Sequence, residues 1–149
     1  MPEELKKLLL KNDKRILFVG IGNLLKKDDG VGVYISSGIS NRLNIEALTV
    51  EVSLENYIGK INRIDPDILV LIDCMEMGSV PGTSKLMSVS KLDDLTFNTH
   101  NISLKRLSEF FKMPVYLLGI QPEKIDFGEN MSYLVREEAE KIINIINSY

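Results

Sequence analysis

The chain has 149 residues, of which 44% are hydrophobic and 26% are charged, and its net charge is −3 at pH 7. These values are ordinary for a soluble globular protein, they provide no basic surface for nucleic acid, and no apolar run approaches the roughly 20 residues needed to span a bilayer. The single cysteine excludes an internal disulfide and a zinc site built from several cysteines. We therefore expect one domain over residues 1–149, cytoplasmic and monomeric.

Residues 1–14 are expected to form a helical extension at the N-terminus. The segment carries acids and only a very short apolar stretch, which does not fit a signal peptide. Leu5, Leu8 and Leu9 fall on one face of a helix, so we expect this face to pack on the domain.

Strand and helix patterns alternate along the rest of the chain. Strand-like runs lie at residues 15–21, 45–52, 68–74, 84–89 and 115–120. Helical patterns lie at residues 30–43, 54–64, 104–111 and 132–146, the last with Ser132 placed as a cap. The runs around Phe18, Leu71 and Leu117 are continuously apolar, as in strands buried on both faces. We therefore predict an α/β three-layer sandwich, with a twisted, mainly parallel sheet of about five strands and helices on both faces.

The first strand ends in a short glycine-containing turn, followed by two adjacent acids. A dinucleotide fingerprint beginning at Gly20 would need a third glycine where Leu25 stands, and no P-loop sequence is present. The glycines therefore fit a tight turn, which Asn23 could stabilise. An acid before a helix usually caps it, so one of Asp28 and Asp29 can cap while the other faces the ligand-binding edge of the sheet.

Asp73 ends the apolar run of the third strand. A carboxylate at that position must face solvent or be satisfied by partners, because burying it alone is costly. The next residue, Cys74, is either a catalytic thiol or, as we favour, a small buried hydrophobe, since adjacent strand residues point to opposite faces. The only histidine, His100, lies in a polar stretch before a helix and is expected at the same edge as Asp29 and Asp73.

These three side chains suggest a metal-directed site. Two carboxylates and one imidazole can hold a transition metal with open positions, and without a thiolate they should bind free metal only modestly. Such a site suits a metal that arrives with a substrate. A rival chemistry uses Asp29 and Asp73 as an acid–base pair that His100 orients. The alternative function is a non-catalytic α/β module that binds nickel or a nucleotide.

In this order, the motifs resemble those of the hydrogenase maturation endopeptidases, which trim the C-terminal extension from the large subunit of nickel–iron hydrogenases. The matching residues are 20–23 with 28–32, 71–73, and 99–100. Further segments are similar to the hydrogenase 3, or formate-hydrogenlyase, branch of this family: residues 55–56, 77–78, 81–82, 99–101 and 118–122.

The resemblance implies an endopeptidase of aspartic or metal-directed type in which Asp29, Asp73 and His100 contact the metal and act in catalysis. It implies the large-subunit precursor of a nickel–iron hydrogenase as the partner, and nickel already inserted in that precursor as the recognition element. Residues 53–56 depart from the glycine–threonine stretch of many relatives, which concerns substrate preference. Gln121, in the turn after the last core strand, is expected to line the cleft.

Overall fold

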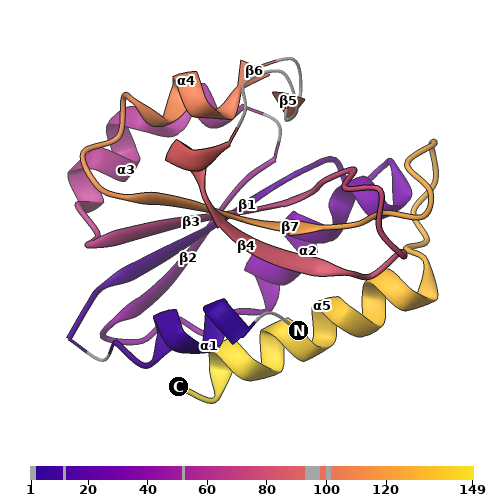
Figure 1. Cartoon of the computed structure of the whole chain (residues 1–149), viewed down its shortest axis with the longest axis horizontal. Helices are drawn as coiled ribbons and strands as arrows, with labels where there is room; N and C mark the ends of the chain where they lie inside the picture. The colour runs from indigo at the N-terminus through magenta and orange to yellow at the C-terminus, as the bar shows by residue number, and fades with distance from the viewer. Residues whose placement is uncertain (1–2, 12, 52, 93–97, 100–101) are drawn as a thin grey trace.

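The computed structural model describes the whole chain except residues 1–2, 12, 52, 93–97 and 100–101 (Figure 1). Its main sheet has the strand order β2-β1-β3-β7-β4, in which β4 alone runs antiparallel to its neighbour. The strands are β1 (Ile16–Ile21), β2 (Ile45–Glu51), β3 (Ile68–Cys74), β4 (Ser84–Ser88) and β7 (Val115–Ile120). The predicted α/β fold with a mainly parallel sheet is confirmed.

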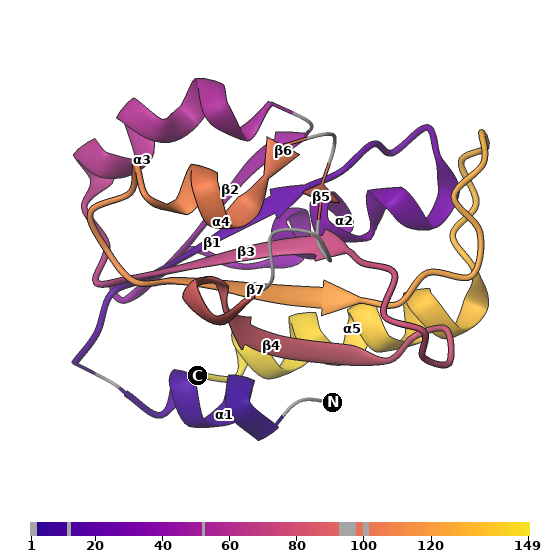
Figure 2. The same ribbon diagram turned by 45° about the horizontal axis from the view of Figure 1, so that its top comes forward.

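Helices cover both faces of this sheet (Figures 1 and 2). One face packs against α1 (Glu3–Leu9), α2 (Val31–Gly38) and α5 (Tyr133–Asn147), and the other against α3 (Ile58–Ile64) and α4 (Leu104–Ser108). Short 3-10 turns complete the connections: η1 (Lys27–Gly30), η2 (Leu54–Tyr57) and η3 (Val89–Lys91). A small antiparallel pair, β5 (Asn98–Thr99) and β6 (Ile102–Ser103), precedes α4. No helix in the described part of the chain has the length and apolar character required to cross a membrane.

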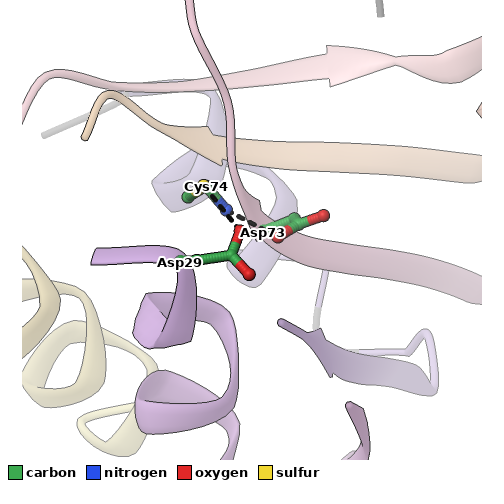
Figure 3. Close-up of side chains that lie close together, drawn as sticks. All are labelled: Asp29, Asp73 and Cys74. Carbon is green, nitrogen blue, oxygen red and sulfur yellow. Dashed lines mark hydrogen bonds between the residues drawn. The ribbon is translucent and has the colours of Figure 1, made fainter. Parts of the chain in front are cut away.

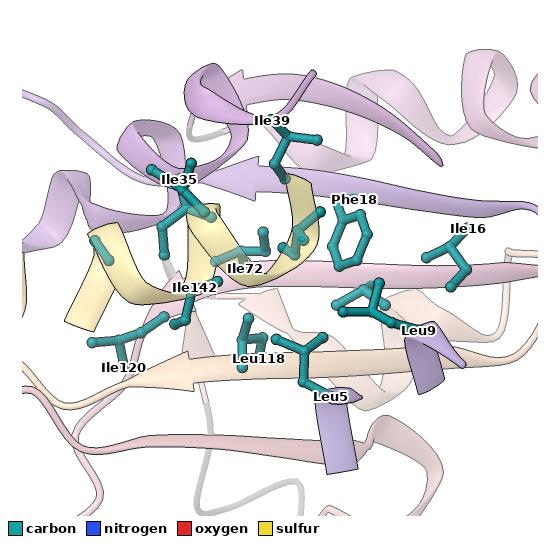
Figure 4. Packing of buried hydrophobic residues seen from close by; sticks show 14 of the residues in the cluster. Leu5, Leu9, Ile16, Phe18, Ile35, Ile39, Ile72, Leu118, Ile120 and Ile142 are labelled. Atoms are coloured by element: carbon teal, nitrogen blue, oxygen red, sulfur yellow. The ribbon is translucent and has the colours of Figure 1, made fainter. Parts of the chain in front are cut away.

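The core is divided by the sheet into two layers, because alternate residues of each buried strand point to opposite faces. Phe18 packs with α1, α2 and α5, whereas its neighbours Leu17 and Val19 pack on the face covered by α3 and α4. Figure 4 shows the first layer, where Leu5 of α1 and Ile142 of α5 approach the strands. Burying a leucine contributes about 1.5–3 kcal/mol, so the predicted apolar face of α1 anchors that helix.

The predicted second helix ends earlier than its pattern suggested. It stops at Gly38 instead of continuing to residue 43, and Ile39 is already extended. Asn147, at the end of α5, holds this point: its side-chain amide donates to the Gly38 carbonyl, and its Oδ1 accepts from the Ser40 amide. The helix end is therefore set by a partner more than 100 residues away in the chain.

Two glycines allow η1 and α2 to lie directly on the strand ends. A Cβ on Gly32 would lie 2.1 Å from the Ile72 carbonyl oxygen and 2.4 Å from that of Ile21, so only glycine permits this approach of α2 to β1 and β3. Gly22 has φ +146°, and a Cβ there would lie 2.1 Å from the Asp29 carbonyl oxygen. This close packing places the Asp28-Asp29 pair against the carboxyl ends of β1 and β3.

Candidate functional site

Asp29, Asp73 and Cys74 meet at the carboxyl edge of the sheet (Figure 3). Asp29 belongs to η1, which follows β1, while Asp73 and Cys74 are the last two residues of the adjacent strand β3. One ligand atom from each of the three side chains lies within 4.8 Å of the others. Parallel neighbouring strands end at the same edge, which is where open α/β sheets bind ligands. The structure thus brings together the two predicted carboxylates.

The Asp29 carboxylate is oriented by one hydrogen bond to each oxygen. The Asn23 amide donates to Oδ2 over 3.2 Å, and the Cys74 thiol donates to Oδ1 over 3.3 Å. Asn23 itself forms the predicted turn, since its Oδ1 accepts from the Leu25 amide. A carboxylate has about four lone-pair sites, so the half-buried Asp29 keeps acceptor capacity for a metal ion or a water molecule.

Asp73 is a buried carboxylate at the end of a central strand, only 1% exposed. Its Oδ1 accepts the amide of the following residue, Cys74, over 2.8 Å. A charge in such a position is costly unless it is compensated, so its presence in an otherwise apolar strand indicates a role other than packing. Its backbone is paired with Gly119 of β7, which fixes the point from which the side chain extends.

Cys74 is part of this cluster, contrary to the interpretation that it is merely a small buried hydrophobe. Its side chain packs against the core layer of α2 and α5 and also donates its thiol hydrogen to Asp29. Burial raises the pKa of the Cys74 thiol, and the charges of Asp73 and Asp29 raise it further. The thiol is therefore protonated at neutral pH, which opposes its use as a nucleophile.

His100, the third predicted site residue, lies outside the described residues. The strands β5 and β6, which precede and follow it in the chain, form an antiparallel pair. Its proximity to Asp29 and Asp73 stays a prediction.

Asp28 has a structural role that the sequence did not reveal. The prediction that one acid of the pair caps the following helix is wrong, because neither η1 nor α2, both within the described residues, has a side-chain cap hydrogen bond. The fully buried Asp28 carboxylate instead binds the segment before α5. It accepts from the amides of Glu123, Lys124 and Ser132 over 2.7–2.9 Å, and from the Ser132 hydroxyl over 2.7 Å. Ser132 is the N-cap residue of α5 as predicted, but its hydroxyl is directed to Asp28. Asp28 thus ties η1 to the β7–α5 loop.

Gln121 holds the loop after β3 through hydrogen bonds, and its side chain is buried, with 3% exposure. Its Oε1 accepts from the amides of Met77 and Ser79, over 2.6 and 3.3 Å, and its Nε2 donates to Glu76 over 2.8 Å. Hydrogen bonds from the Gly78 amide and from Gln121 lower the pKa of Glu76. Gln121 therefore orders the loop after Asp73, a role more specific than the expected one of lining the cleft.

The protein is an α/β protein with a mainly parallel sheet. Two carboxylates from different segments lie close together at the carboxyl edge of this sheet, which is where enzymes of this architecture bind their ligands. Residues 52–149 match the sequence profile of the family described as hydrogenase maturation protease. The chain therefore belongs to the hydrogenase maturation protease family and is a peptidase by this membership.

Individual relatives agree with this assignment. A Methanocaldococcus jannaschii protein provisionally named a hydrogenase maturation protease is 29% identical, covering 92% of this chain and 89% of its own. The hydrogenase 3 maturation protease of Escherichia coli is 26% identical over 82% of each chain. The crystal structure of the maturation protease HycI from Thermococcus kodakarensis superposes with a TM-score of 0.85, at 25% identity and over 97% of each chain.

Proposed function

We propose that the protein is an endopeptidase that removes the C-terminal extension of a nickel–iron hydrogenase large-subunit precursor after nickel insertion. This proposal rests on one observation: Asp29 and Asp73 lie close together at the carboxyl edge of the sheet, in a chain that belongs to this family. The similarity to the Escherichia coli hydrogenase 3 maturation protease supports a substrate of the hydrogenase 3 type. The cytoplasmic location and the monomeric state expected from the sequence stay predictions.

We regard nickel as part of the substrate, carried in by the precursor. The donor set fits such an ion, because the ligand atoms of Asp29 and Asp73 lie within 4.8 Å of each other and carboxylate oxygens bind divalent metals. His100 would supply the imidazole. A bound nickel ion supplies Lewis acidity, which polarises a carbonyl or acidifies water.

The two carboxylates are suited to different tasks. Asp73, buried and held by the strand end, provides a fixed charge, whereas the half-buried Asp29 can hold a water molecule and accept its proton. In the proposed hydrolysis, the water oxygen bonds to the peptide carbonyl carbon, the water proton passes to a carboxylate, and the C–N bond breaks as the leaving amine is protonated. The non-catalytic alternative uses the same residues only for binding.

Cleavage of a nickel-loaded precursor is the test. The purified protein is mixed with nickel-loaded and with nickel-free large-subunit precursor, and the intact mass of each precursor is followed over time. We expect loss of one defined C-terminal peptide from the loaded form only. Equal cleavage of the nickel-free form would refute nickel as the recognition element, and an unchanged mass of every candidate loaded precursor would favour the non-catalytic binding module.

Cys74→Ala is expected to lower kcat/KM for this cleavage by less than about tenfold, because the protonated thiol donates only one weak hydrogen bond to Asp29, whose other oxygen keeps the Asn23 amide. The same intact-mass assay measures kcat/KM for the variant and for the parent protein. Complete loss of cleavage by a variant with an unaltered circular dichroism spectrum would instead support a thiol mechanism.

A further inference from the structure

Four large apolar side chains stand exposed on two loops at the carboxyl edge of the sheet. Leu24 and Leu25, in the loop after β1, are 50% and 59% exposed. Ile125 and Phe127, in the loop after β7, are 55% and 77% exposed. We call these four residues the apolar ridge. Exposed apolar groups gathered on one feature of a soluble protein mark surfaces that bind partners.

The two loops that carry the ridge are paired with each other. Lys26 and Gly128 form a parallel β-bridge, in which the Lys27 amide donates to the Gly128 carbonyl and the Gly128 amide donates to the Leu25 carbonyl, each over 2.8 Å. Figures 1 and 2 both show the β7–α5 loop beside the loop that leads into α2. The ridge therefore stands on hydrogen-bonded backbone.

Side chains reinforce this pairing. The Lys26 ammonium lies 5.3 Å from the centroid of the Phe127 ring, and Lys27 forms an ion pair with Asp126 over 3.2 Å. Asp28 adds its four buried hydrogen bonds to the same loop. A surface that is already ordered loses little conformational entropy when it binds, which favours recognition of a partner.

Hydrogen bonds join the loops that carry the ridge to the candidate active site. Asn23, next to Leu24, donates its amide to the Asp29 carboxylate, and Asp28, next to Asp29, holds the loop that carries Phe127. A protein surface seated on the ridge would therefore be placed at a fixed position relative to Asp29. The substrate of the proposed reaction is a protein whose C-terminal extension must reach that carboxylate.

We propose that the apolar ridge docks an apolar surface on the folded body of the large-subunit precursor and so directs its C-terminal extension to Asp29 and Asp73. This inference rests on the proposed function. Aromatic side chains near the centre of an interface usually contribute most to the binding energy, so we expect Phe127 to contribute more than the other ridge residues. Leu25, whose carbonyl accepts from the Gly128 amide, is expected to contribute next.

The test compares ridge variants with variants at the opposite edge of the sheet. Leu25→Ser and Phe127→Ser are combined in one protein, and Leu43→Ser and Phe110→Ser in a matched control. Leu43 and Phe110 are 89% and 63% exposed, and they lie in the loops that lead into the amino ends of β2 and β7. Substitutions of exposed residues usually change stability by less than about 0.5 kcal/mol, so both proteins should fold.

Cleavage rates are measured over a range of nickel-loaded precursor concentrations. We expect the ridge variant to raise KM at least about tenfold with kcat nearly unchanged, and the control variant to match the parent protein. Equal KM values for parent and ridge variant would overturn docking and leave the proposed function intact. Failure of the parent protein to cleave any loaded precursor would overturn both. A concentration-dependent dimer abolished by Phe127→Ser, with unchanged KM, would assign the ridge to a second copy of this chain.

Discussion

Asp73→Asn is expected to lower kcat/KM for precursor cleavage by at least about 10³-fold while the protein remains folded, since an active-site carboxylate that holds charge or moves a proton contributes on this scale. Asparagine has the same shape and its Oδ1 can still accept the Cys74 amide, so the backbone at the strand end keeps its hydrogen bond. The change removes the carboxylate charge and replaces the second carboxylate oxygen with an amide NH2 group, which can only donate. Intact-mass kinetics on the nickel-loaded precursor measure the loss.

Companion variants define how far the site extends. Asp29→Asn and His100→Ala are expected to abolish cleavage in the same way. Cys74→Ala, which removes one weak hydrogen bond to Asp29, serves as the control that keeps most of the activity. Circular dichroism and thermal unfolding establish that each variant is folded. Normal cleavage by Asp73→Asn would exclude Asp73 from the reaction, and normal cleavage by His100→Ala would exclude the imidazole.

Asp28→Ala should destabilise the fold strongly, by about 3–5 kcal/mol, because it removes the acceptor for four hydrogen bonds and leaves buried donors without one. Urea unfolding followed by circular dichroism gives the change in the free energy of unfolding. The loss should be accompanied by release of the β7–α5 loop, seen as faster amide exchange at Glu123 and Lys124.

Asp126→Ala is the matched control for this prediction. Asp126 lies in the same loop and contacts the same segment, but its ion pair with Lys27 is exposed, with the Asp126 side chain 71% accessible. Exposed ion pairs contribute little to stability because solvent screens them, so this variant should unfold almost like the parent protein. If Asp28→Ala unfolded at the same urea concentration as Asp126→Ala, the buried carboxylate would not hold the two loops together.

Local sequence patterns were sufficient for the strands of the main sheet, but they missed the short pair β5 and β6 and were insufficient for the helix ends. Residues 68–74 and 115–120 were predicted with the bounds observed for β3 and β7, because short apolar runs rich in branched side chains and flanked by polar residues fit central strands buried on both faces. Of the predicted helix at residues 104–111, only Leu104–Ser108 is α-helical. Helix ends depend on groups that satisfy the last carbonyls, and at Gly38 that group is Asn147, which no local window contains.

The sequence by itself determined the class of fold and the positions of the candidate carboxylates, since an acid that interrupts or follows a buried strand must lie at the edge of the sheet. Only the tertiary structure decided what each acid does. Asp28 and Asp29 are neighbours of the same type, yet Asp28 binds backbone amides 95 to 104 residues further along the chain, while Asp29 meets Cys74 beside Asp73. These partners come together only when the strands pair and the loops fold over their ends, so no local pattern could assign the two roles.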